Sequence, residues 1–175
     1  MTDKRPNLLL QRVAFIGIVI CLFVSAGQSQ TRQKESLRGL SGVRVYVHPV
    51  AKEVEAGGLS TAQIQNAVEK QLRAAGISIQ SEPQAADGSA MLMVVVGVVK
   101  RPAEEAYLFD VEVSLLQAVH LTRREDPEPF PAQTWGQKAL GITGPKRMDL
   151  ILEPLKARLG DFVNDYLSVN PKPQS

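Results

Sequence analysis

The sequence predicts an α+β domain built as a two-layer sandwich, with elements in the order β-α-β-β-β-β-α. Two stretches with apolar residues at three- and four-residue steps predict the helices. Stretches of alternating or continuously apolar residues predict a mainly antiparallel sheet. Because both helical stretches are amphipathic, each needs an apolar sheet surface to cover, so we expect the two helices on one face of the sheet.

The first predicted strand and the first predicted helix lie in the first half of the chain. Alternation over residues 43–48 predicts a half-buried strand, which Pro49 ends. Ser60 and Gln63 have the spacing of a capping box, so the helix begins after Ser60. Gly76 is suited to its C-terminal end. The apolar stripe of this helix comprises Ile64, Ala67, Val68, Leu72 and Ala75.

Four further strands are predicted in the middle of the chain. Residues 77–80 form a short strand after the helix, and residues 91–99 are apolar on both faces, which is typical of a central strand. Residues 107–116 alternate, and the strand continues toward Leu121, a length that predicts a bend or a bulge. Residues 132–142 form the return strand.

The strongest helical signal follows Pro145. Apolar residues recur at helical spacing from Met148 to Tyr166 and predict a long amphipathic helix. Pro154 lies inside this stretch. Because proline is tolerated only in the first turn, the helix either bends at Pro154 or begins there.

The first 26 residues have the layout of a secretory signal. A basic segment, residues 1–12, precedes 14 apolar residues, 13–26, whose last three are small. A membrane-spanning helix needs about 20 residues, which favours a cleaved signal over an uncleaved anchor. The only cysteine is Cys21. Ile20 precedes it, and a lipid-attachment signal needs a small residue there.

The rest of the chain divides into three parts. Residues 27–38 are polar and predict a flexible linker, residues 39–169 form a single α+β domain, and residues 170–175 predict a disordered tail. After removal of residues 1–26 no cysteine remains, which excludes disulfides, a thiol nucleophile and cysteine metal sites.

Charge argues against a nucleic-acid partner. The chain has 20 basic and 18 acidic side chains, and the predicted signal holds three of the basic and one of the acidic ones. The remaining chain therefore has 17 of each and is formally neutral. A dedicated nucleic-acid-binding domain carries a basic patch or stripe.

Few residues suggest chemistry, and each has a simpler interpretation. His48 and His120 could form a metal site with Asp110 or Glu112, but no spacing such as H-x-H supports it. Asp110 and Glu112 lie two apart on one strand face, as catalytic carboxylates could, yet a half-exposed sheet places charge there too. We therefore expect no catalytic residue, no metal site and no cofactor. Trp135 is more typical of core packing than of a binding surface.

One sheet face should remain without a helical cover. The strand at 91–99 is apolar on both faces, and two helices can cover only one of them. The other face needs a partner, a further layer or a membrane. The candidate partner-facing residues are Tyr46, His48, Asp110, Glu112 and His120.

Over residues 40–168, the predicted order of elements resembles the layout of small envelope assembly factors, such as the lipopolysaccharide-assembly lipoproteins and the N-terminal domain of the TolB translocation protein. The resemblance is one of topology and carries no site residue. This chain departs from the lipoproteins because it lacks a lipid-attachment cysteine.

These observations together favour an exported, periplasmic or extracellular cell-envelope protein that is not an enzyme. Its expected task is to bind an envelope protein or to assist an assembly, with membrane contact only through an uncleaved residue 13–26 segment. Two alternatives stay open: a carrier of a lipid or another apolar ligand, and an exported hydrolase that uses Asp110 and Glu112.

Overall fold

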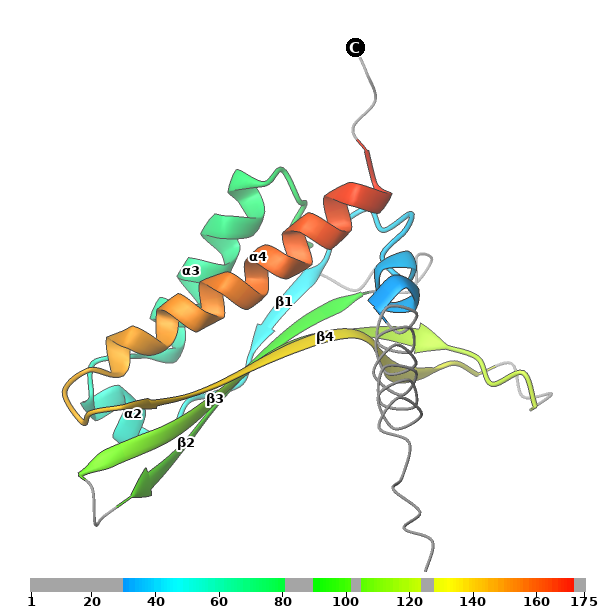
Figure 1. Ribbon diagram of the computed structural model, residues 1–175. Helices are drawn as coiled ribbons and strands as arrows, with labels where there is room; N and C mark the ends of the chain where they lie inside the picture. Colours follow the sequence, from blue (N-terminus) through cyan, green and yellow to red (C-terminus); the bar gives the residue numbers. More distant parts are fainter. Residues whose placement is uncertain (1–29, 81–89, 102–104, 124–127, 172–175) are drawn as a thin grey trace, which may run out of the picture.

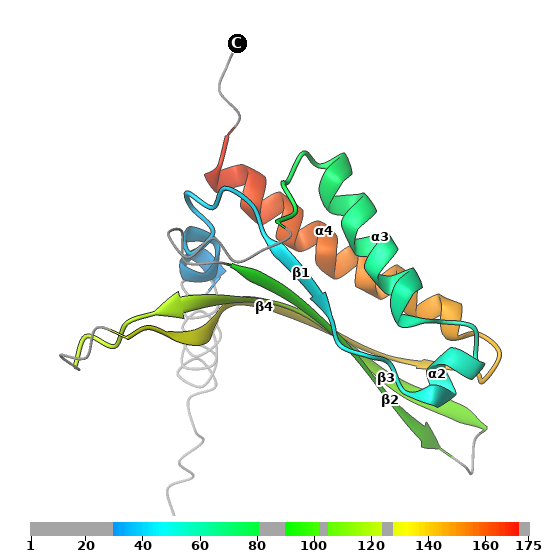
Figure 2. The ribbon, with the colours of Figure 1, turned by 180° about the vertical axis from the view of Figure 1, so that it is seen from behind.

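A four-stranded sheet with strand order β1-β2-β3-β4 forms one layer of the computed structural model, and helices form the other (Figure 1). The structure describes residues 30–80, 90–101, 105–123 and 128–171. Seen from the front and from behind, the two long helices lie on the same side of the sheet (Figures 1 and 2). The predicted α+β class and the two-layer arrangement are confirmed.

The sheet is mixed. β1 (Arg44–Val47) runs parallel to β2 (Met91–Arg101), while β3 (Ala106–Val119) is antiparallel to both β2 and β4 (Phe130–Thr143). The parallel pair needs a crossover connection. The segment between β1 and β2 supplies it, and this segment contains the first long helix.

The long strand expected to need a bend or a bulge pairs across a bulge that lies in its partner, β4. The pairing of β3 with β4 shifts between Leu115, which pairs with Trp135, and Leu116, which pairs with Gln133. Thr134 is the extra residue. Beyond the bulge, β3 and β4 continue past the first residue of β2 as a two-stranded arm that projects from the body (Figure 1).

After β1, the described residues form two long helices, a short helix and a 3-10 turn. They are α2 (Lys52–Ala56), α3 (Thr61–Ala74), η2 (Met148–Ile151) and α4 (Leu152–Val169). The capping box is formed: the Gln63 N–H donates to Ser60 Oγ at 3.2 Å, and the Ser60 N–H donates to Gln63 Oε1 at 2.7 Å. α4 begins at Leu152, so Pro154 lies in its first turn, where a proline is tolerated because its missing N–H would have no intrahelical partner.

One expected strand is not formed. Residues 77–80 make only an isolated parallel bridge, in which Ile79 pairs with Val43. The Val43 N–H donates to the Ser78 carbonyl and the Gln80 N–H donates to the Val43 carbonyl, each at 3.0 Å. This segment pairs the backbone N–H and carbonyl of Val43, just before β1, and does not extend the sheet. The sheet therefore has four strands where the sequence predicted five.

The core lies between the helices and the sheet. Trp135 from β4 and Phe162 from α4 are buried at its centre, with ring centroids 5.1 Å apart in an edge-to-face arrangement. The Trp135 Nε1–H donates to Asp165 Oδ2 at 2.9 Å, which satisfies its only polar group. The expectation that Trp135 packs in the core is confirmed.

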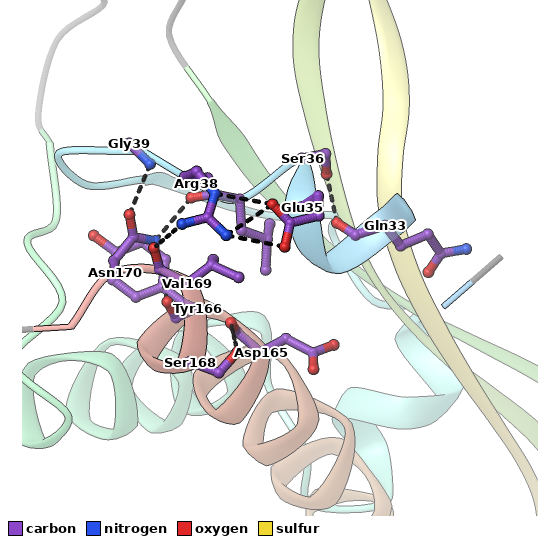
Figure 3. Close-up of polar contacts among 11 residues, drawn as sticks. Gln33, Glu35, Ser36, Arg38, Gly39, Asp165, Tyr166, Ser168, Val169 and Asn170 are labelled. Atoms are coloured by element: carbon purple, nitrogen blue, oxygen red, sulfur yellow. Dashed lines mark hydrogen bonds and ion pairs between the residues drawn. The ribbon is translucent and has the colours of Figure 1, made fainter. Parts of the chain in front are cut away.

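The segment before β1 is part of the domain. Residues 30–35 are helical, and Leu37 is fully buried in the core. Figure 3 shows how the C-terminal end of α4 holds this segment: Asn170 donates to the Leu37 carbonyl at 2.8 Å and accepts from the Gly39 N–H at 2.7 Å. The linker expected at 27–38 thus contributes Leu37 to the packed domain, and the tail expected at 170–175 contributes Asn170. The local sequence pattern did not reveal these contacts because they join residues that are distant in sequence.

The predicted secretory signal at 1–26 lies outside the described residues. Within the part of the chain that the structure describes, no helix combines the length and the apolar character needed to cross a membrane.

Candidate functional site

The face of the sheet opposite the helices, which we call the open face, carries the candidate site. Along β3, the side chains of Phe109, Val111 and Val113 are buried against the helices. Alternation places the even-numbered residues of β3 on the open face. Through strand pairing they lie in rows with residues of β2 and β4, and two of these rows differ in character.

The first row is apolar. Val99, Leu108 and Ile142 pair directly across three strands, and Leu140 lies one row away on β4. Their exposed fractions are 65%, 41%, 61% and 85%, respectively. We call these four residues the distal patch, because they lie at the end of the sheet where β2 turns into β3. A contiguous group of exposed branched aliphatic side chains marks an interaction surface.

The second row is charged. Glu112 pairs with Lys138 across β3 and β4, and their side chains form an ion pair with 2.9 Å between Nζ and Oε2. The hydrogen bond to Glu112 raises the pKa of Lys138, and the charge of Asp110 adds to this effect. Lys138 therefore remains a cation across the neutral range. The ion pair places one positive and one negative side chain side by side in the middle of the open face.

Asp110 depends on a glycine beside it. It pairs with Gly97, and a Cβ at Gly97 would lie 2.1 Å from Asp110 Oδ1. The carboxylate thus lies over the glycine backbone. Asp110 and Glu112 share the open face, but Lys138 already engages Glu112. The arrangement presents charge on a flat surface.

The residues predicted to face a partner separate into two groups. Tyr46 lies in the row of Met93 and Ser114, next to the charged row that holds Glu112. Tyr46 and His48 are exposed, and the His48 N–H donates to the Val94 carbonyl at 2.8 Å. These residues share the open face with Asp110 and Glu112. His120 is also exposed, but it follows the end of β3 on the projecting arm.

The two histidines are too far apart to share a metal ion. Val47, next to His48, pairs with Val94, and Val94 pairs in turn with Val113. From Val113 to His120 the chain advances seven residues, roughly 23 Å at about 3.3 Å per strand residue. A metal ion needs ligand atoms at about 2 Å. Within the described ranges, no group of three or more potential ligands from histidine, cysteine, aspartate and glutamate lies together.

Sequence reasoning missed the distal patch. Leu140 and Ile142 look like core residues of a strand, yet they are exposed. The alternation of side chains along β4 could have revealed it. Trp135 faces the core, so residues 139 and 141 lie on the covered face, and residues 140 and 142 lie on the open face. The bulge precedes Trp135 and therefore does not disturb this alternation. The covered side of this stretch holds only small residues because the Phe109 ring fills the space there, 2.3 Å from a Cβ at Gly141.

A second candidate site is a polar groove of about 550 Å³ beside the helix at 30–35. It runs between this segment, β4 and α4, and Arg158 pairs with Asp161 in it at 3.2 Å. All its lining residues are polar: Gln30, Thr31, Gln33, Lys34, Gln137, Arg158, Asp161, Asn164 and Asp165. Such a lining is unlike that of a lipid-binding cavity, which is mostly apolar.

Comparisons of the sequence with protein-family models and with curated proteins gave no match. The function is therefore argued from the geometry of the open face.

Proposed function

We propose that this protein is an exported, non-enzymatic binding domain of the cell envelope and that the open face of its sheet binds a protein partner. The observation that carries the proposal is the distal patch, in which four aliphatic side chains from three strands are exposed together. Both long helices lie on the other side of the sheet, so neither can cover the patch (Figures 1 and 2).

The charged row gives such an interface its specificity. Apolar contacts supply most of the affinity of a protein interface, whereas charges select the partner and its orientation. Glu112 and Lys138 are held against each other, and Asp110 lies in the next row, where it pairs with Leu140 of the distal patch. We infer that the partner places apolar residues on the patch and a cationic or hydrogen-bonding group near Asp110.

The two alternatives have weaker support. A hydrolase needs a carboxylate free to transfer a proton, and Glu112 is occupied by Lys138. A carrier needs an enclosed apolar cavity, and the groove beside residues 30–35 is polar and open to solvent. A protein-binding surface needs an exposed apolar patch, which matches the arrangement of β2, β3 and β4.

Photo-cross-linking in the producing cell tests the binding surface. A photoreactive amino acid is placed at Leu108 or Ile142 on the open face and, as the matched control, at Ala157, which is exposed on α4. We expect discrete adducts from positions 108 and 142 and none from position 157. Equal adduct patterns at all three positions, or none at 108 and 142 in folded protein, would contradict the proposal.

Export is tested separately. Cell fractionation followed by mass measurement of the intact protein reports both its location and its first residue. We expect the protein outside the cytoplasm, with Gly27 as its first residue. Recovery from the cytosol with residues 1–26 intact would exclude an envelope role while leaving the binding surface to be judged on its own test.

A further inference from the structure

The two edges of the sheet differ in their protection against pairing with another strand. One edge is formed by β1, which has only four residues. The other edge is β4, with 14 residues. Short strands, prolines, bulges and charges are the usual ways in which proteins block an edge.

Only the first nine residues of β4, 130–138, carry such protection. They contain Pro131, the bulge at Thr134 and the charged Lys138. The last five residues, 139–143, contain no charge, no proline and no bulge. This is also the part that presents Leu140 and Ile142 to solvent. An unprotected apolar edge strand is a site for pairing with another strand.

The sequence of residues 139–143 is complementary to itself. In an antiparallel pair centred on Gly141, Leu140 of one chain lies opposite Ile142 of the other, and the same contact occurs twice. Cross-strand pairs of aliphatic residues on one face stabilise a sheet. On the opposite face Ala139 lies opposite Thr143, and two glycines meet at the centre, so no large side chain obstructs the approach.

Charge also favours this register. Lys138 of one chain would lie opposite Gly144 of the other, so the two Lys138 side chains are six residues apart along the strands, roughly 20 Å at about 3.3 Å per residue. Like charges directly opposite each other destabilise a strand pair, and this register avoids that contact. A two-fold axis makes the contact closed, with the same residues used by both chains.

We propose that residues 139–143 of β4 pair antiparallel with the same residues of a second copy of this chain, around a two-fold axis at Gly141. The two four-stranded sheets then form one continuous sheet. This inference rests on the proposed function, because it names a second copy as the partner of Leu140 and Ile142, the two residues of the distal patch that lie on the edge strand. Leu140 and Ile142 lie at the contact, while Val99 lies two strands away.

Sedimentation equilibrium on residues 30–175 tests the pairing. This fragment contains the whole core, which extends from Leu37 to Val169. We expect a concentration-dependent equilibrium between one and two copies. Leu140→Lys and Ile142→Lys should each weaken it by on the order of tenfold or more, and the matched patch variant Val99→Lys should leave it nearly unchanged. Circular dichroism checks that each variant is folded.

Disulfide formation tests the register. The fragment lacks cysteine, since Cys21 is the only one in the chain. Residues opposite each other in an antiparallel pair have Cα atoms about 4.5 to 5.5 Å apart, which suits a disulfide. A mixture of Leu140→Cys and Ile142→Cys chains should therefore cross-link faster than either variant alone.

Three outcomes would overturn the inference: a monomer at every concentration, equal weakening by Val99→Lys, or fastest cross-linking by Leu140→Cys alone. A monomeric fragment combined with an adduct of a different protein at position 142 would overturn the self-pairing and leave the proposed function standing. Dimers without any adduct of another protein support the self-pairing.

Discussion

The two faces of β3 have the same backbone and adjacent residues, yet they are in different environments. Phe109, Val111 and Val113 are buried under the helices, whereas Leu108 on the other face is exposed beside Ile142. Leucine is as apolar as valine, so side-chain type alone does not set its burial. For these four residues, burial follows the side of the sheet on which the helices lie, and substitutions at matched positions test this difference.

The largest contrast is expected between a core aromatic residue and the distal patch. Phe162→Ala removes a fully buried ring that contacts Trp135 edge to face, and it should lower the free energy of unfolding by about 3 to 5 kcal/mol. Leu140→Ala should change it by less than about 0.5 kcal/mol because this side chain is mostly exposed. Chemical denaturation of monomeric protein, at concentrations below any self-association, measures both. Similar losses would contradict the assignment of the two faces.

A pair of glycine substitutions compares the faces directly. Gly141→Ala would place a methyl group against the Phe109 ring on the covered face and should cost about 1 to 3 kcal/mol. The atoms nearest to a Cβ at Gly97 belong to the Asp110 carboxylate on the open face, and this end of a side chain can turn away, so the cost of Gly97→Ala should be smaller. Thermal unfolding of both variants tests the order, and a larger loss for Gly97→Ala would contradict it.

Alkaline pH should affect a buried phenol and an exposed amine differently. Burial raises the pKa of Tyr166, whose hydroxyl donates to the Leu40 carbonyl at 2.7 Å. Because the folded-state pKa lies above the ordinary value of 10.0, the stabilisation is full below pH 10 and is lost as pH rises through the folded-state pKa. Tyr166→Phe should cost about 0.5 to 1.5 kcal/mol at pH 7 and a smaller amount at high pH.

Lys138 is the matched control on the open face. Its pKa is raised as well, so its contribution also disappears at alkaline pH, but it is an exposed ion pair and should be screened by salt. Denaturation series across pH, at low and high ionic strength, separate the two groups. If the stability change caused by Tyr166→Phe depended on salt as strongly as the change caused by Lys138→Met, burial would not be the cause of the raised pKa of Tyr166.

The smallest effect is expected at Ser114. This side chain is buried on the open face beside Met93 and Gly136, and among the described residues its hydroxyl has no hydrogen-bond partner. Ser114→Ala should therefore change stability by less than about 0.5 kcal/mol or increase it. Thr143→Val, on the covered face, breaks a 2.7 Å hydrogen bond to the Arg147 carbonyl and should cost about 1 kcal/mol. Chemical denaturation gives both values, and a larger loss at Ser114 would reveal a partner for its hydroxyl.

Much of the fold could be predicted because its signals are local. The capping box at Ser60 and the place of Pro154 in the first turn of α4 each depend on a few neighbouring residues. The strand expected at 77–80 was wrong because pairing depends on distant residues, and there only Val43 is available. The site was found only in part. Asp110 and Glu112 were identified by their charge, but the exposed Leu140 and Ile142 resemble core residues.

By itself, the sequence determined which residues form helices and strands and which side chains share a strand face, because periodicity and end signals act within a few residues. Only the tertiary structure decided which face of β2 the helices cover. β2 is apolar on both faces, so its pattern cannot choose between them. The choice depends on how α3 and α4 pack over the odd-numbered residues of β3, and that packing leaves Leu140 and Ile142 exposed at the edge of the sheet.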